Sequence, residues 1–122
     1  MTIPISTTID KIFKQYLVLM NGVLSREKRL SNLEIDVLEK MLYIDHIYRH
    51  LPKNNRDKIL FHTKTRERIR ESVYNISPNS YNNVLSKLRK KGMLIGNTLG
   101  VTNPLKDKDK VVIEFRLELN AE

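Results

Sequence analysis

Three asparagines and a run of cations lie in one short segment of the sequence. Asn79, Asn82 and Asn83 come first, and an Asn side chain can pair through two hydrogen bonds with adenine in the major groove of DNA. The cations that follow are Lys87, Arg89, Lys90 and Lys91. Such side chains neutralise backbone phosphates. The segment therefore predicts contact with duplex DNA through both bases and phosphates.

A helix must carry these residues for them to share a surface. Ser77-Pro78 predicts its start, since Ser is a good N-cap and Pro fits the first helical position. Gly92 predicts its end. The inward residues at helical spacing are Tyr81, Val84, Leu85 and Leu88. The outward residues are then Asn79, Ser80, Asn82, Asn83, Ser86, Lys87, Arg89 and Lys90.

A second basic helix is expected just before this one, capped by Thr63 or Thr65 and ending near residue 74. It carries four cations that could contact flanking phosphates: Lys64, Arg66, Arg68 and Arg70. Between the two helices, Asn75 can take the left-handed conformation that a tight turn needs. Residues 52–92 hold 11 basic and 3 acidic side chains, so this third of the chain carries a net charge equal to the +8 of the whole. A localised positive field attracts a polyanion.

The sequence gives little support for a metal site or an enzyme active site. His46 and His50 lie four residues apart beside Asp45, which suits a shared metal, but no third ligand has matching spacing. The chain has no cysteine and no glycine-rich phosphate loop. We therefore expect no enzyme, no cofactor and no metal.

The preceding segment predicts a long helix with a clear start. Ser31 and Glu34 form a capping box pattern, an apolar stripe continues through residues 33–51, and Pro52 ends it. Residues 52–57 are expected to form a polar loop, and residues 58–62 a short β-prone stretch.

Two strands are expected after Gly92. Residues 93–97 form a short apolar run, and residues 111–119 alternate between apolar and polar side chains. The polar loop between them, residues 98–110, carries Lys106, Lys108 and Lys110, with Asp107 and Asp109 interleaved. Paired strands joined by such a loop would make a wing.

The order of these elements resembles that of winged helix-turn-helix DNA-binding proteins. The resemblance rests on RIRESVYNISPNSYNNVLSKLRKKGMLIGN and on LSNLEIDVLEKML, which is similar to the first helix of that fold. It implies an α+β fold, with a three-helix core and a β-hairpin wing, over residues 30–122. The Asn-rich helix and the closing strands also resemble those of small phage-encoded proteins.

Residues 1–29 are then an N-terminal helical extension. Asn21-Gly22 could instead form a hairpin turn, but the spacing of Ile9, Phe13 and Leu17 favours a helix. Its apolar stripe, which includes Tyr16 and Met20, either completes the core or pairs with a second copy. We expect a homodimer or a larger assembly.

Together these features predict a cytoplasmic, regulatory protein that binds double-stranded DNA and has no membrane span. The alternative is a structural or adaptor subunit of a phage particle or similar assembly. It would be located in the virion and would use the same fold for contacts with other protein subunits.

Overall fold

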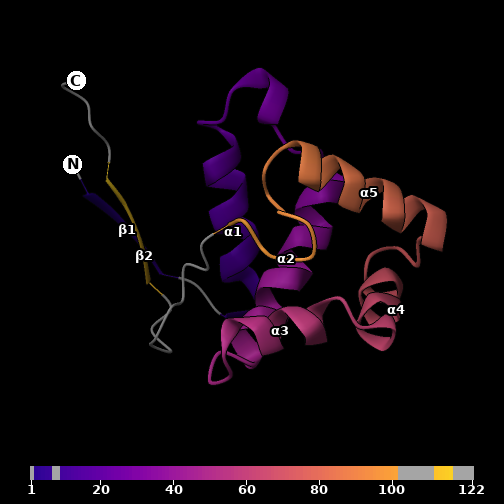
Figure 1. The fold of residues 1–122 in the computed structure, drawn as a ribbon. Coiled ribbons are helices and arrows are strands. Elements are labelled where there is room, and N and C mark those ends of the chain that lie inside the picture. The colour runs from indigo at the N-terminus through magenta and orange to yellow at the C-terminus, as the bar shows by residue number, and fades with distance from the viewer. Residues whose placement is uncertain (1, 7–8, 102–111, 117–122) are drawn as a thin grey trace.

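The computed structural model describes residues 2–6, 9–101 and 112–116. Within these residues, five α-helices form one body, and two short strands pair beside it (Figure 1). In chain order the elements are β1 (Thr2–Ser6), α1 (Ile9–Asn21), the 3₁₀ helix η1 (Arg26–Lys28), α2 (Asn32–Ile47), α3 (Lys53–Leu60), α4 (Thr63–Ser72), α5 (Pro78–Lys90) and β2 (Val112–Arg116).

Helix α2 is the centre of the fold and contacts each of the other four α-helices. Its start is the predicted capping box, because the Ser31 Oγ accepts a hydrogen bond from the Glu34 N–H and the Glu34 carboxylate accepts one from the Ser31 N–H. Val37 and Met41 of α2 are completely buried. Burial of this apolar surface is the main source of stability for the helical body.

Helix α1 packs along α2, so the helical interpretation of residues 9–20 is confirmed over the hairpin. Ile12, Phe13 and Leu17 lie in the core of their own chain, at 0%, 1% and 0% exposure. The Asn21 side chain fastens the end of α1 by exchanging two hydrogen bonds with the backbone of Leu30. Phe13 and Leu17 therefore complete the core of their own chain, the first of the two alternatives, and the homodimer or larger assembly stays a prediction.

Helix α3 replaces the polar loop and β-prone stretch expected at residues 52–62, so that prediction is wrong. The apolar run Ile59-Leu60-Phe61 is too short for its period to separate strand from helix. Contacts with other parts of the fold determine that this segment is a helix. The Arg56 Nε donates to Asp45 of α2 at 2.9 Å, and the Arg56 Nη1 donates to the Leu51 carbonyl at 2.8 Å.

Helices α4 and α5 form the expected pair joined by a tight turn. His62, rather than Thr63 or Thr65, caps α4, with its Nδ1 accepting from the Lys64 N–H. In the turn, Asn75 has the left-handed φ that we expected, 50°, and Tyr74 shares it at 56°. Ser77 caps α5 ahead of Pro78, as predicted.

The predicted wing is wrong, and with it the winged helix-turn-helix fold. Residues 93–97 form no strand but part of a compact turn, closed by one bridge between Leu94 and Leu99. Strand β2 lies within the predicted strand 111–119, but it pairs antiparallel with β1, from Thr2 opposite Arg116 to Ser6 opposite Val112. The body is helical, and no β-hairpin follows α5 in the part of the chain that is described.

The alternation in residues 111–119 indicates a strand but not its partner, which explains this error. The partner is the N-terminal segment TIPIS, more than a hundred positions away in the sequence. The wing lysines Lys106, Lys108 and Lys110 lie outside the described residues.

Candidate nucleic-acid interface

Helix α5 presents one apolar and one polar face, as predicted. Its inward residues are Tyr81, Val84, Leu85 and Leu88, which are all buried at 4% exposure or less. The middle of the opposite face is a stripe at helical spacing, and all of its members are exposed: Asn79, Asn83, Ser86 and Lys90. The helix contains no acidic residue. This face therefore offers only amide, hydroxyl and cationic groups.

The amides at the start of α5 are available to a ligand. Asn79, Asn82 and Asn83 are exposed, and their side chains have no hydrogen bond to the described residues. Ser80 is different, because its hydroxyl accepts from the Ser77 Oγ at 3.0 Å and so belongs to the helix cap. The three asparagines are thus better candidates than Ser80 for reading bases.

At the end of α5, two of the four predicted cations serve the fold. The Arg89 Nε donates to the Gly96 carbonyl and its Nη2 to the Asn97 Oδ1, both at 2.9 Å. The Lys91 ammonium pairs with the carboxylate of Glu34 and also donates to the Arg29 carbonyl. Arg89 and Lys91 therefore hold neighbouring segments in place, and their predicted contact with phosphates stays a prediction.

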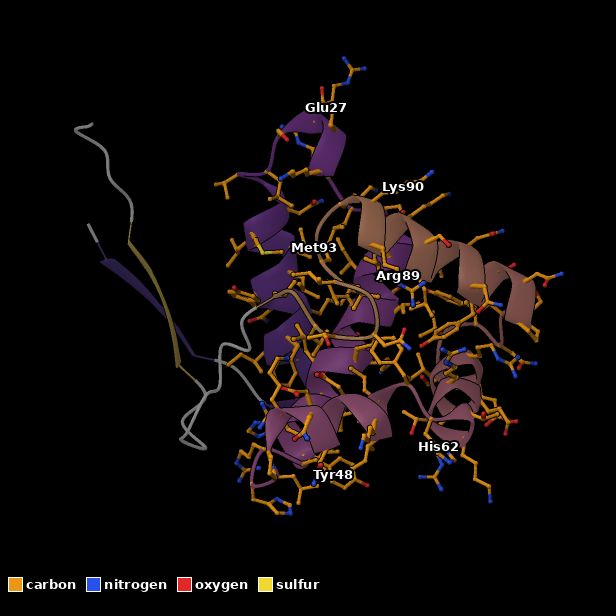
Figure 2. The ribbon with its side chains drawn as sticks, viewed as in Figure 1. Glu27, Tyr48, His62, Arg89, Lys90 and Met93 are labelled. Atoms are coloured by element: carbon orange, nitrogen blue, oxygen red, sulfur yellow. The ribbon has the colours of Figure 1, made fainter. Side chains whose placement is uncertain are left out.

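Lys87 and Lys90 remain exposed on α5 and make no ion pair with the described residues. Figure 2 shows Lys90 on the outer side of the helix and Arg89 beside the turn that follows it. These two lysines are the cations of α5 that can meet a phosphate without breaking an internal contact.

The four cations of α4 divide into two pairs by helical spacing. Lys64 and Arg68 are exposed to solvent, and their contact with flanking phosphates stays a prediction. Arg66 and Arg70 are partly buried and face α5. The Arg70 Nη1 donates to the Ile76 carbonyl in the turn at 3.2 Å, and the Arg66 guanidinium lies 6.0 Å from the centre of the Phe61 ring.

A hollow of about 280 Å³ separates α4 from the first half of α5. It is lined by Thr63, Arg66, Glu67 and Arg70 of α4 and by Pro78, Tyr81 and Asn82 of α5. Burial raises the pKa of the Tyr81 hydroxyl to about 12, while the positive charges of Arg66 and Arg70 oppose that rise. Two cations and a protonated phenol thus lie around one small space.

Three further cations were missed by sequence reasoning. Arg26, Lys28 and Arg29 are exposed in and after η1. The hydrogen bond from Lys91 to the Arg29 carbonyl places them next to the end of α5. They are some sixty positions away in the sequence, and nothing in the local pattern connects them to α5. The positive surface around Lys87 and Lys90 is therefore larger than predicted.

The two histidines considered as metal ligands differ in their exposure to solvent. His46 is buried with its ring 5.8 Å from that of Phe13, whereas His50 is exposed. Among the described residues, no three His, Cys, Asp or Glu side chains are grouped so that they could hold a metal ion. None of the helices in this part of the chain has both the length and the apolar character needed to cross a membrane.

No protein-family model, curated protein or solved structure matches the chain. A function for the chain therefore has to be inferred from the geometry of its own residues.

Proposed function

We propose that the protein binds double-stranded DNA through the outer face of α5 and acts as a regulator. Asn79, Asn82 and Asn83 contact base edges, and Lys87 and Lys90 contact the phosphate backbone. The observation that carries the proposal is the composition of this face, which has exposed lysines, no acidic side chain and three amides without a hydrogen bond to the described residues.

The dimensions of a helix suit this role. An α-helix with its side chains is about 10–12 Å across, and the major groove is about 12 Å wide. Helix α5 packs against α2, and Leu85 and Leu88 on its inward side are buried in the core, so the polar side is held on a rigid support. A helix fixed in this way can enter the groove without a loss of order.

Phosphate contacts on either side come from two elements in place of a wing. Lys64 and Arg68 lie on α4, which precedes α5 in the chain, and Arg26 and Lys28 lie on η1, next to the other end of α5. Cations at both ends of the helix would fix its register along the groove.

A fluorescence-anisotropy titration with a duplex of mixed sequence tests the proposal. Because phosphate contacts release counterions, affinity should fall steeply between about 50 and 200 mM salt. The double variant Lys87→Gln/Lys90→Gln should bind more weakly and with a shallower salt dependence. Its matched control is Lys11→Gln/Lys58→Gln, which removes the same charge from exposed sites on α1 and α3. Equal effects of the two variants, or no binding at the lowest salt, would refute the assignment to α5.

The second candidate is the structural or adaptor subunit, and exposed apolar side chains on α1 favour it. Val18 and Leu19 are 51% and 41% exposed and line a hollow with Lys14 and Gln15. Sedimentation velocity of the full chain, compared with Val18→Glu/Leu19→Glu, tests it. An assembly that dissociates in the variant, together with an absence of DNA binding, would favour this function over the first.

A further inference from the structure

The hollow between α4 and α5 has the features of a binding site for a small anion. Arg66 and Arg70 lie one helical turn apart on α4 and both face it, and Tyr81 and Asn82 close it from α5. Glu67 is the one acidic group in its lining, so the charge of the lining is positive. The side chains come from two helices and meet at the joint between them.

Arg66 is the residue that most needs a partner there. Its Nε is buried and has no hydrogen-bond acceptor among the described residues. A buried donor without an acceptor is unfavourable, especially in a charged group. The Phe61 ring near the guanidinium supplies a cation–π contact but no acceptor for the Nε–H.

The other groups in the hollow add donors. The hydroxyls of Thr63 and Tyr81 and the amide of Asn82 can each donate a hydrogen bond. A tyrosine hydroxyl with its ordinary pKa near 10 is already protonated at neutral pH, and burial raises the pKa of Tyr81 further, to about 12, so this hydroxyl can donate. The hollow therefore combines two guanidinium groups with further donors around one space.

We infer that this hollow binds an oxyanion of the phosphate class, with Arg66 and Arg70 as its main ligands. Guanidinium groups match the oxygens of a phosphate with paired, charge-assisted hydrogen bonds. A volume of about 280 Å³ also leaves room for a substituent on the phosphate. The oxyanion could be a backbone phosphate of bound DNA or a free phosphate, which share the same chemistry. In the first case the inference rests on the proposed function, and in the second case it does not.

Occupancy of the hollow would also affect the joint between the helices. Arg70 already holds the turn through its hydrogen bond to the Ile76 carbonyl, and Asn82 belongs to the proposed base-reading face. A bound anion would link α4 to both of these and fix the angle at which α5 is presented.

Titration of the full-length protein with inorganic phosphate, followed by NMR of the arginine Nε–H signals, tests the inference without DNA. The Arg66 signal, assigned by its absence in Arg66→Gln, should shift in a saturable manner with a Kd of about 1 mM or tighter. Chloride at matched ionic strength should give no such shift. In Arg66→Gln, backbone amide signals around the hollow should respond at least about tenfold more weakly.

The matched control is Lys58→Gln, which removes a positive charge from an exposed position of α3 outside the hollow. It should respond to phosphate as the wild type does. If circular dichroism shows that Arg66→Gln does not fold, Arg66→Lys replaces it in the experiment. This variant keeps the charge but lacks the planar fork of the guanidinium group, so it should also lose the response to phosphate. Equal responses to phosphate and chloride, or equal responses in wild type and Arg66→Gln, would overturn the inference.

DNA binding in phosphate-free buffer then identifies the source of the anion. If Arg66→Gln weakens binding to all sequences alike and lowers the salt slope by about one, the oxyanion is a backbone phosphate. If DNA affinity is unchanged, the hollow serves a free phosphate. A phosphate response in a protein that binds no DNA would refute the proposed function and leave this inference standing.

Discussion

The carboxylate of Glu34, in the first turn of α2, forms an ion pair with the ammonium of Lys91, just beyond the end of α5. The same Glu34 oxygen accepts the hydrogen bond from the Ser31 N–H that completes the capping box. One buried carboxylate thus caps the central helix and fixes the end of the helix proposed to enter the groove. The neighbouring Lys90 is exposed and makes no ion pair with the described residues.

Substitution of Lys91 by Met should therefore destabilise the fold. The Glu34 side chain is only 4% exposed, so removal of its partner leaves an uncompensated buried charge, which costs about 3 kcal/mol. Lys90→Met, one position earlier, should change the free energy of unfolding by less than about 0.5 kcal/mol. Urea denaturation of both variants measures the difference. At temperatures where both are folded, Lys90→Met should be the variant with weaker DNA binding. Equal destabilisation by the two variants would contradict the assigned roles.

Base reading by Asn83 predicts a sequence-dependent loss. After a preferred site has been selected from random duplexes, Asn83→Ala should weaken binding to that site by about 1–3 kcal/mol and binding to random DNA by less. Asn54→Ala, which removes an exposed amide from α3, should change neither. Competition titrations with both DNAs measure the ratio. If Asn83→Ala weakens binding to both DNAs equally, Asn83 does not read bases.

The sequence predicts those parts of the fold that depend on local patterns. The capping box of Ser31 and Glu34, the Ser77-Pro78 start and the buried face of α5 each involve residues a few positions apart, and each is confirmed. Helix α3 was missed because its short apolar run has no distinct period, while the Arg56–Asp45 contact that fixes it is tertiary.

In the candidate site too, the features that depend on local patterns could be predicted, and those that depend on distant residues could not. The exposed asparagines follow from helical spacing alone. The structural roles of Arg89 and Lys91 do not, because their partners Asn97 and Glu34 are 8 and 57 positions away. The partner of β2 was also misassigned for this reason, since register and pairing across the whole chain leave no local signal.

Burial of Phe13 predicts that α1 is part of the folding unit. Phe13 is 1% exposed and its ring lies 6.3 Å from that of Tyr43, so Phe13→Ala should cost about 3–5 kcal/mol in the free energy of unfolding. Val18→Ala, on the exposed side of α1, should cost less than about 0.5 kcal/mol. Chemical denaturation with parallel sedimentation separates the roles. A Phe13→Ala variant that dissociates but stays equally stable would instead place Phe13 at a contact between two copies.

The raised pKa of the Tyr81 hydroxyl predicts that the folded protein loses stability at alkaline pH. The unfolded chain releases a tyrosine proton at a pKa near 10, whereas the folded pKa is raised to about 12 by burial. Between about pH 10 and 12 the native state binds the extra proton, so the free energy of unfolding falls as pH rises through that window. Below it, Tyr81 contributes no pH dependence. Tyr81→Phe should make the decline between about pH 9.5 and 11.5 shallower by about 2 kcal/mol. Parallel urea unfolding curves for wild type and variant would show this, and identical declines would contradict it.

The close packing around Gly100 predicts that the turn after α5 contributes to the stability of the fold. Its N–H donates to the Met93 carbonyl at 2.8 Å, and a Cβ at this position would lie 2.6 Å from the Gly92 carbonyl oxygen. Because that atom belongs to the backbone, the turn must open to accept even a methyl group. Gly100→Ala should therefore cost about 1–3 kcal/mol.

The matched control for Gly100→Ala is Gly22→Ala after α1, where the nearest atom to the new Cβ, the Leu19 carbonyl oxygen, is at an ordinary 3.4 Å. It should be near neutral in thermal denaturation. In Gly100→Ala, Arg89 should also lose its contacts with Gly96 and Asn97, since these residues lie in the same turn. The Arg89 Nε–H NMR signal would then move toward that of a solvated side chain. An unchanged signal in a destabilised variant would show that Arg89 does not depend on the shape of this turn.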